Sequence, residues 1–128
     1  LRAATAARRG TMVVLPTKPE RCVHEALRAH GIDFMTEHPI GPFCVDVYIP
    51  STRTAIFVDG CYWHGCPKHF PDGKKGARRP KQDACRIPYL TKCGYNVGIV
   101  WEHDALEDAW QALKKYVQPF GQSGQEAL

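Results

Sequence analysis

Residues 55–69 read Ala-Ile-Phe-Val-Asp-Gly-Cys-Tyr-Trp-His-Gly-Cys-Pro-Lys-His, and chemically reactive side chains are concentrated there. The apolar run 55–58 predicts a short buried strand, and Gly60 lets the backbone turn directly after it. Asp59 therefore lies where the strand ends, a position from which side chains commonly reach a ligand. The stretch predicts a catalytic carboxylate at a strand end, followed by a loop rich in metal-binding side chains.

The cysteines and histidines of this loop have the spacing of metal ligands. Cys61, Cys66 and His69 follow the pattern C-x4-C-x2-H, and His103 supplies a fourth ligand for tetrahedral zinc. The chain has six cysteines, so three disulfides are the alternative. We favour zinc, because no secretion signal is recognisable and histidines lie among the cysteines. The other four lie in apolar patterns and are expected to pack in the interior: Cys22, Cys44, Cys85 and Cys93.

Length and composition predict one domain without a membrane span. The chain has 128 residues, 44% of them hydrophobic, and no apolar run long enough to cross a bilayer. The basic start lacks the apolar core of a signal peptide, which predicts a cytoplasmic protein. The net charge is +4, and basic residues cluster in two places, Arg8 with Arg9 and Lys74, Lys75, Arg78 with Arg79. Such clusters suit the phosphate backbone of double-stranded DNA, although a solvated surface loop is the commoner origin of a charge run.

The sequence predicts a flexible basic arm at 1–16, an ordered domain at 17–118 and a disordered tail at 119–128. Thr17 is expected to cap a helix that Gly31 ends. Further along the chain, the pattern predicts extended chain at 32–38, strands at 43–49, 55–58 and 95–101, a helix at 83–92 weakened by Pro88, and a final helix at 106–117. The strands at 43–49 and 55–58 should form a hairpin.

This order of elements, with acidic residues at strand ends, resembles the core of the PD-(D/E)xK nucleases. Within that superfamily, the strings at 59–64, 94–97 and 100–102 resemble the very-short-patch-repair (Vsr-like) endonucleases and the EDxHD homing endonucleases. The resemblance covers about residues 19–105. It implies an α/β fold in which helices flank a central mixed sheet, together with a structural zinc site.

The resemblance also implies catalytic roles, which fall on Glu20, Asp46, Asp59, His64 and Asp83. Glu20 matches the helical glutamate, with Glu25 as second choice, and Asp46 matches the strand carboxylate, although Val45 replaces the usual preceding proline. Asp59 stands where the repair enzymes have threonine, and the superfamily lysine is absent. Asp46 and Asp59 would hold Mg2+, His64 would exchange a proton with water or the leaving group, and Asp83 would orient His64. Taken singly, each has a structural interpretation as a turn, cap or packing residue.

In these enzymes zinc ligands occur at the positions of Cys61, Cys66 or its neighbours, His69 and His103, and the aromatics at Tyr62 and Trp63 wedge between base pairs. The alternative for Tyr62 and Trp63 is simple packing of the loop. The basic segment after His69 lacks the further aromatic residue of the repair enzymes, which leaves mismatch specificity open.

The sequence predicts a Mg2+-dependent DNA endonuclease that makes nicks or double-strand breaks, associated with the nucleoid. One alternative is a T:G mismatch-specific nicking enzyme. Another is a zinc-stabilised DNA-binding module without catalysis, against which the intact set of catalytic residues argues. We also expect that the domain is fused to, or excised from, a longer protein.

Overall fold

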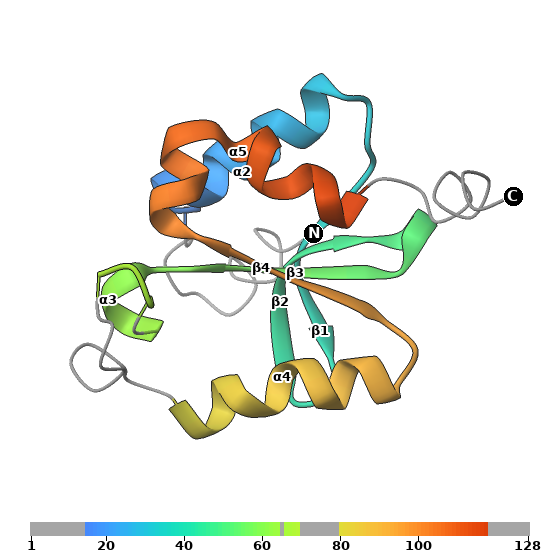
Figure 1. The fold of residues 1–128 in the computed structure, drawn as a ribbon. Helices are drawn as coiled ribbons and strands as arrows, with labels where there is room; N and C mark the ends of the chain where they lie inside the picture. Colours follow the sequence, from blue (N-terminus) through green and yellow to red (C-terminus); the bar gives the residue numbers. More distant parts are fainter. Residues whose placement is uncertain (1–14, 65, 70–79, 118–128) are drawn as a thin grey trace, which may run out of the picture.

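The computed structural model describes residues 15–64, 66–69 and 80–117, and Figure 1 shows their arrangement. A four-stranded sheet has helices on both faces. With the labels of Figure 1, the elements in chain order are α2 (Lys18–Ala29), β1 (Met35–Ile40), β2 (Phe43–Ile49), a 3-10 turn (Pro50–Thr52), β3 (Thr54–Asp59), α3 (Cys61–His64), α4 (Pro80–Lys92), β4 (Asn96–Trp101) and α5 (Glu102–Val117). The predicted α/β fold with a mixed sheet is confirmed.

The strands lie in the sheet in chain order, and only the last pair is parallel. β1 pairs antiparallel with β2, and β2 with β3, which confirms the predicted hairpin. β4 returns beside β3 in parallel, in a register that places Asp59 next to Trp101. The residues that follow both strands therefore leave the sheet at the same edge. This pairing brings Cys61 near His103, 42 positions later in the chain.

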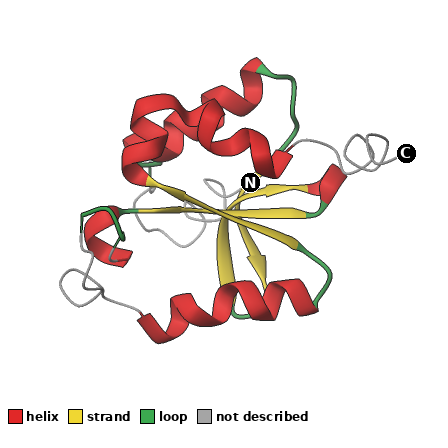
Figure 2. Cartoon of the chain, viewed as in Figure 1, coloured by secondary structure: helices red, strands yellow, loops and turns green. Residues whose placement is uncertain are grey.

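Helices α2 and α5 cover one face of the sheet and α4 covers the other, as the layers in Figure 2 show. A separate buried cluster lies on each face. The first includes Val23 and Leu27 of α2 and Leu113 of α5, packed on β2, β3 and β4. The second is centred on Phe57 and on Leu90 of α4. Each helix is thus fixed by an apolar stripe, as expected for a three-layer domain.

Local sequence signals predicted the start of α2 correctly but not the start of α4. Thr17 caps α2 as predicted, and a reciprocal bond from its amide to Glu20 completes a capping box. Helix α4 begins at Pro80, earlier than the predicted residue 83, and continues through Pro88. An internal proline costs about 3 kcal/mol, but fully buried Leu90 anchors the helix.

The last helix begins at Glu102, directly after β4, whereas the sequence predicted a start at residue 106. Its backbone leaves helical geometry at Asp108, whose side chain accepts the amide hydrogen of Gln111. A short helix, α3, also occupies the loop that the sequence marked as reactive. Its four residues are too few to give a helical pattern in the sequence.

The six cysteines are all present as thiols, with no disulfide. The expectation that four of them pack in the interior is wrong for Cys44, Cys85 and Cys93, which are exposed, while Cys22 is partly buried. Cys44 and Cys93 lie near element ends, and Cys85 lies within α4 but is exposed, so an apolar neighbourhood in sequence does not become an apolar neighbourhood in space.

The predicted arm at 1–16, apart from residues 15 and 16, and the predicted tail at 119–128 lie outside the described residues. Within the described part of the chain, none of the helices combines the length and apolarity that a bilayer crossing requires.

Candidate active site and metal-binding groups

A pocket of about 630 Å3 opens between the ends of β2 and β3 and helix α4. Four of the five predicted catalytic residues line it: Asp46, Asp59, His64 and Asp83. The structure thus brings side chains from four elements into one cavity. Its remaining lining residues are Pro42, Phe43, Cys44, Phe57, Cys85 and Arg86.

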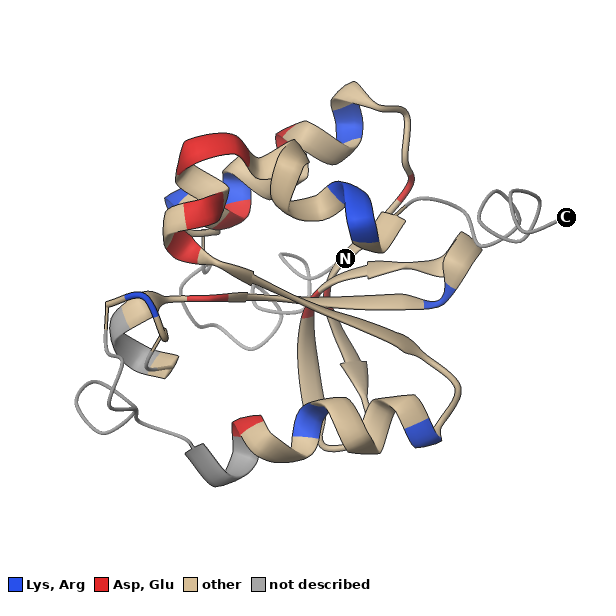
Figure 3. Cartoon of the chain, in the orientation of Figure 1, with Lys and Arg blue, Asp and Glu red and all other residues tan. Residues whose placement is uncertain are grey.

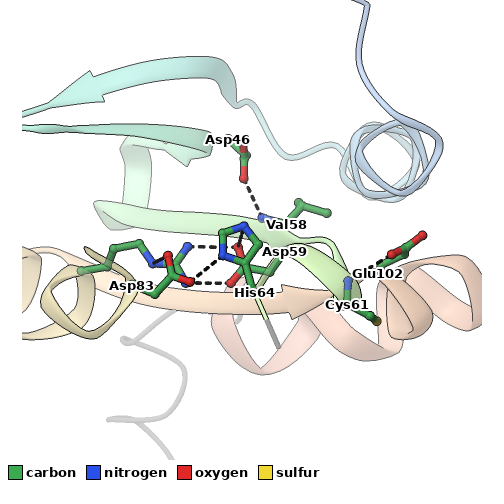
Figure 4. Close-up of polar contacts among 8 residues, drawn as sticks. Asp46, Val58, Asp59, Cys61, His64, Asp83 and Glu102 are labelled. Carbon is green, nitrogen blue, oxygen red and sulfur yellow. Dashed lines mark hydrogen bonds and ion pairs between the residues drawn. The ribbon is translucent and has the colours of Figure 1, made fainter. Parts of the chain in front are cut away.

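His64 lies between two carboxylates, as Figure 4 shows. Its Nδ1 donates a hydrogen bond of 2.6 Å to Asp83 Oδ2, while its Nε2 lies 3.8 Å from Asp59 Oδ1. The side chain of His64 is 21% exposed, so the ring is reachable from the pocket although its orientation is fixed. The hydrogen bond to Asp83 sets the tautomer of the ring and leaves Nε2 on the side of Asp59.

Asp59 is almost fully buried and is held by Arg86 of α4. Two hydrogen bonds join the guanidinium to the carboxylate, 3.0 Å from Nη1 to Oδ1 and 2.7 Å from Nη2 to Oδ2. The Arg86 guanidinium also lies over the ring of Phe57, 4.4 Å from its centroid. Burial alone would lower the pKa of Arg86, but its hydrogen bonds and charge contacts with Asp59 raise it, so the guanidinium keeps its charge in the fold.

Sequence reasoning missed Arg86. It follows Asp83 by three positions on α4, and an i, i+3 charge pair on the sheet-facing side of a helix was the available signal.

Asp46 has a different environment from Asp59. Its Oδ2 accepts the amide hydrogen of Val58 at 2.8 Å. Burial raises the pKa of Asp46 to about 7, the Val58 bond opposes that shift, and the negative charges of Glu20, Glu37 and Asp59 add to it. A carboxyl group surrounded by other carboxylates is a natural position for a cation, which would relieve the repulsion.

Glu20, Glu37 and Asp46 place carboxylate oxygens within 4.8 Å of one another. Glu20 and Asp46 were predicted as site residues, and Glu37 was not. Glu37 lies in β1 with a left-handed backbone, φ of 52°, which is rare for a residue other than glycine. The second-choice glutamate, Glu25, is exposed. The sequence offered no signal for Glu37, because its proximity to Asp46 depends on the β1–β2 pairing.

The four predicted zinc ligands form a second group, again within 4.8 Å. Cys61 Sγ lies 3.2 Å from Nδ1 of His103, and Cys66 Sγ lies 3.5 Å from Nδ1 of His69 and 3.6 Å from Nδ1 of His103. In a tetrahedral zinc site, bond lengths of about 2.3 Å to sulfur and 2.0 Å to nitrogen place the two ligand atoms roughly 3.5 Å apart. Both the separations and the donor types fit zinc.

The zinc-ligand group is also joined to α5 through the backbone. Glu102 Oε1 accepts the amide hydrogen of Cys61 at 3.1 Å, where α3 begins. Burial raises the pKa of the Cys61 thiol, so zinc binding there would release a proton.

The predicted DNA contacts lie beyond what the structure describes. Arg8, Arg9, Lys74, Lys75, Arg78 and Arg79 fall outside the described residues, and the side chains of Tyr62 and Trp63 are not described either.

Comparison with known proteins identifies the domain. A sequence model of the family described as DNA mismatch endonuclease Vsr matches residues 6–69, half of the chain. The Type II nicking enzyme V.NaeI of Lentzea aerocolonigenes is 33% identical over 110 residues, covering 76% of this chain and 66% of that protein. The Type II nicking enzyme V.XorIIP of Xanthomonas oryzae pv. oryzae is 32% identical over 95 residues, covering 67% and 70%. The chain therefore spans about two thirds of the length of these relatives.

A solved structure has the same fold. The catalytic domain of the homing endonuclease I-Bth0305I matches with a TM-score of 0.59 and 25% identity, over 79% of this chain and 94% of that domain. The predicted resemblance to both groups of enzymes is confirmed, and the chain belongs to the family of Vsr DNA mismatch endonucleases, whose endonuclease domain it carries.

Proposed function

We propose that this protein is a Mg2+-dependent endonuclease that hydrolyses phosphodiester bonds of double-stranded DNA, with His64 as general acid or base. The observation that carries the proposal is the position of His64, oriented by Asp83 and facing the pocket that Asp46 also lines. A histidine in that position can take a proton from the attacking water or give one to the departing oxygen. The family match and the nicking relatives support the same reaction class.

The donor set around Asp46 fits Mg2+. Carboxylate oxygens are the protein ligands that Mg2+ prefers, and Asp46, Glu20 and Glu37 supply them from three elements. When bound, Mg2+ would lower the pKa of a coordinated water and neutralise charge on the phosphoryl oxygens. The sequence predicts Asp59 as a second ligand, but both of its oxygens accept bonds from Arg86, so the proposed Mg2+ site is built on Asp46, Glu20 and Glu37.

For the group of Cys61, Cys66, His69 and His103 we propose a structural role. Four protein ligands would close the coordination sphere of zinc, which leaves no position for water or substrate. The metal would fix the loop that carries His64 to the start of α5. Zinc would thereby contribute to catalysis only through the placement of His64.

A second candidate function is nicking at T:G mismatches, which the family match favours. Tyr62 and Trp63 would then insert between base pairs, and unstacking costs least at a mismatch. We expect either activity in the cytoplasm, at the nucleoid.

The test is to incubate the purified protein with Mg2+ and with matched duplex, T:G-mismatched duplex and single-stranded DNA in parallel, and to map every break. His64→Ala serves as the inactive control. Cleavage of duplex DNA that needs Mg2+ and is lost in His64→Ala supports the proposal, and preference for the mismatch selects the second candidate. If the wild-type protein binds duplex DNA but cuts none of the three DNA substrates, the alternative of a DNA-binding module without catalysis is supported instead.

A further inference from the structure

The site contains a buried cation that the proposed reaction does not use. Arg86 is only 8% exposed, yet it lines the pocket. Both of its terminal nitrogens donate hydrogen bonds to Asp59. A guanidinium stays protonated at any pH the protein meets, so this charge is permanent.

The remaining nitrogen of the guanidinium faces the other carboxylate beside His64. Arg86 Nε lies 3.7 Å from Asp83 Oδ1, which is close enough for charge attraction and too long for a hydrogen bond. Among the described residues, Nε is the buried side-chain nitrogen that has no hydrogen-bond partner. The two acids that flank His64 are thus both oriented toward one guanidinium, and the ring of Phe57 supports that guanidinium from one side.

We propose that Arg86 is a positioning residue. It holds the carboxylate of Asp59 beside His64 and prevents that carboxylate from binding the catalytic cation. The inference rests on the proposed endonuclease function. It divides the carboxylates in and beside the pocket into two groups, a cation group of Glu20, Glu37 and Asp46, and a histidine group of Asp59 and Asp83.

The division follows from geometry and charge. A cation ligated by Asp59 would lie beside the Arg86 guanidinium, which already takes both carboxylate oxygens in short, charge-assisted bonds. Asp46 instead accepts a backbone amide hydrogen, it has acidic neighbours, and Arg86 acts on it through charge while its printed hydrogen bonds go to Asp59. The cation is therefore favoured on the Asp46 side.

Removal of the guanidinium should reverse this preference. Without Arg86, Asp59 becomes a buried and uncompensated carboxylate near Asp46, and a divalent cation is the available counter-charge. Asp59 would turn toward that cation and away from His64. We expect an added or tighter cation site together with slower chemistry, rather than weaker DNA binding.

The experiment compares Arg86→Met with Arg53→Met as a matched control. Arg53 also lies over an aromatic ring, Tyr95, at 4.3 Å, and donates hydrogen bonds to backbone carbonyls, but no site carboxylate binds it. Mn2+ binding is measured without DNA by electron paramagnetic resonance, as a probe for the cation. Steady-state nicking then gives kcat and KM, and thermal melts report folding.

For Arg86→Met we expect one additional Mn2+ per chain, or about tenfold tighter binding, and a kcat at least about tenfold lower with KM for DNA nearly unchanged. Arg53→Met should lower thermal stability and leave Mn2+ binding and kcat as in the wild type. In the Arg86→Met/Asp59→Asn double variant the additional Mn2+ binding should disappear, because the carboxylate that attracts it is gone.

Folded Arg86→Met with wild-type Mn2+ binding and wild-type kcat would overturn the inference and leave Arg86 a structural residue. Should Arg86→Met fail to fold, Arg86→Gln carries the same comparison, since glutamine removes the charge and keeps an amide that can donate one hydrogen bond to Asp59. Absence of cleavage in the wild type would instead refute the proposed function, while the Mn2+ comparison would still decide whether Arg86 excludes the cation from Asp59.

Discussion

Asp46 has a pKa of about 7 because burial and three acidic neighbours outweigh one amide hydrogen bond. In the unfolded chain this carboxyl ionises near its ordinary value of 3.8. Folding therefore makes ionisation of the Asp46 carboxyl less favourable. The unfavourable contribution of Asp46 to the free energy of unfolding is absent below about pH 4, grows as the pH rises, and reaches its full size above the folded pKa of about 7.

Asp46→Asn should consequently stabilise the metal-free protein. Asparagine keeps an oxygen for the Val58 amide and carries no charge. In the presence of a chelator, the gain in unfolding free energy should be on the order of 1–4 kcal/mol at pH 8 and should shrink toward pH 5. Thermal melts from pH 5 to pH 8 measure it.

The same variant should lose DNA cleavage, and added Mg2+ should raise the melting temperature of the wild type but not of Asp46→Asn. Glu25→Gln is the matched control, since Glu25 is an exposed acid on α2. A pH-independent difference in stability between Asp46→Asn and the wild type would contradict the account of Asp46.

At the residue scale, the sequence was a good guide where reactive residues are close in the chain or fall on a family motif. Asp46, Asp59, His64 and Asp83 were predicted and do line one pocket. Glu37 could not be assigned, and Arg86 offered only its i, i+3 spacing from Asp83, because the importance of both depends on neighbours that only the folded chain provides. Their roles stay proposals, as do those of the predicted site residues.

At the scale of elements, the parallel pairing of β3 and β4 determines where the metal-binding groups lie. Both strands end at the same edge, so α3 and the first turn of α5 meet there. β2, β3 and β4 were predicted closely because their apolar runs are bounded by turns, whereas the sequence predicted only extended chain at 32–38 where β1 spans Met35–Ile40. The starts of α4 and α5 and the short α3 were not predicted, since tertiary packing sets them.

Zinc content should be close to one per chain. Cys61→Ser or Cys66→Ser should lower both the zinc content and the melting temperature, because the energy of ligation is energy of folding. Cys93→Ser is the matched control, as Cys93 is exposed and lies outside the zinc-ligand group. Elemental analysis combined with thermal melts decides the matter, and a stable wild-type protein free of zinc would exclude the site.

The contact between β4 and α5 depends on a glycine. A Cβ added at Gly98 would lie 2.7 Å from the ring of Tyr116, whose hydroxyl donates a hydrogen bond to the Ile99 carbonyl. Gly98→Ala should therefore cost roughly 1–3 kcal/mol of stability through overpacking. Denaturant unfolding measures the loss. Gly98→Ala introduced into Tyr116→Ala should cost much less, and equal losses in both backgrounds would show that Tyr116 is not the obstacle.

Over the whole molecule, charge is unevenly distributed. Acidic residues gather on the first half of α5, at Glu102, Asp104, Glu107 and Asp108, as Figure 3 shows in red. That surface would repel a phosphate backbone. DNA binding must depend on other parts of the chain, and the basic segment after His69 is the candidate that the sequence predicts.

Replacing Lys74, Lys75, Arg78 and Arg79 with Ala should weaken binding to every duplex alike. Each lost phosphate contact should flatten the slope of log affinity against log salt concentration by about 0.9. Tyr62→Ala with Trp63→Ala should instead weaken binding mainly to a mismatched or deformable site, because only that complex unstacks bases.

Titration of both variants against random and mismatched duplexes at several salt concentrations distinguishes the two kinds of contact. Lys114→Ala with Lys115→Ala, at the far end of α5, is the control that should leave the slope unchanged. An unchanged slope in the four-residue variant would remove that basic segment from the interface.

The return of β4 beside β3 also constrains the order of folding. Cys61, Cys66 and His69 are close in sequence, but His103 reaches them only after α4 has formed a crossover and β4 has docked in parallel. Closing so long a segment is a slow, entropically costly step. Before β4 docks, the chain can offer three neighbouring ligands, and the fourth ligand arrives with the last strand. Completion of the coordination sphere would therefore mark the docking of the last strand, and bound zinc would report that the sheet is complete.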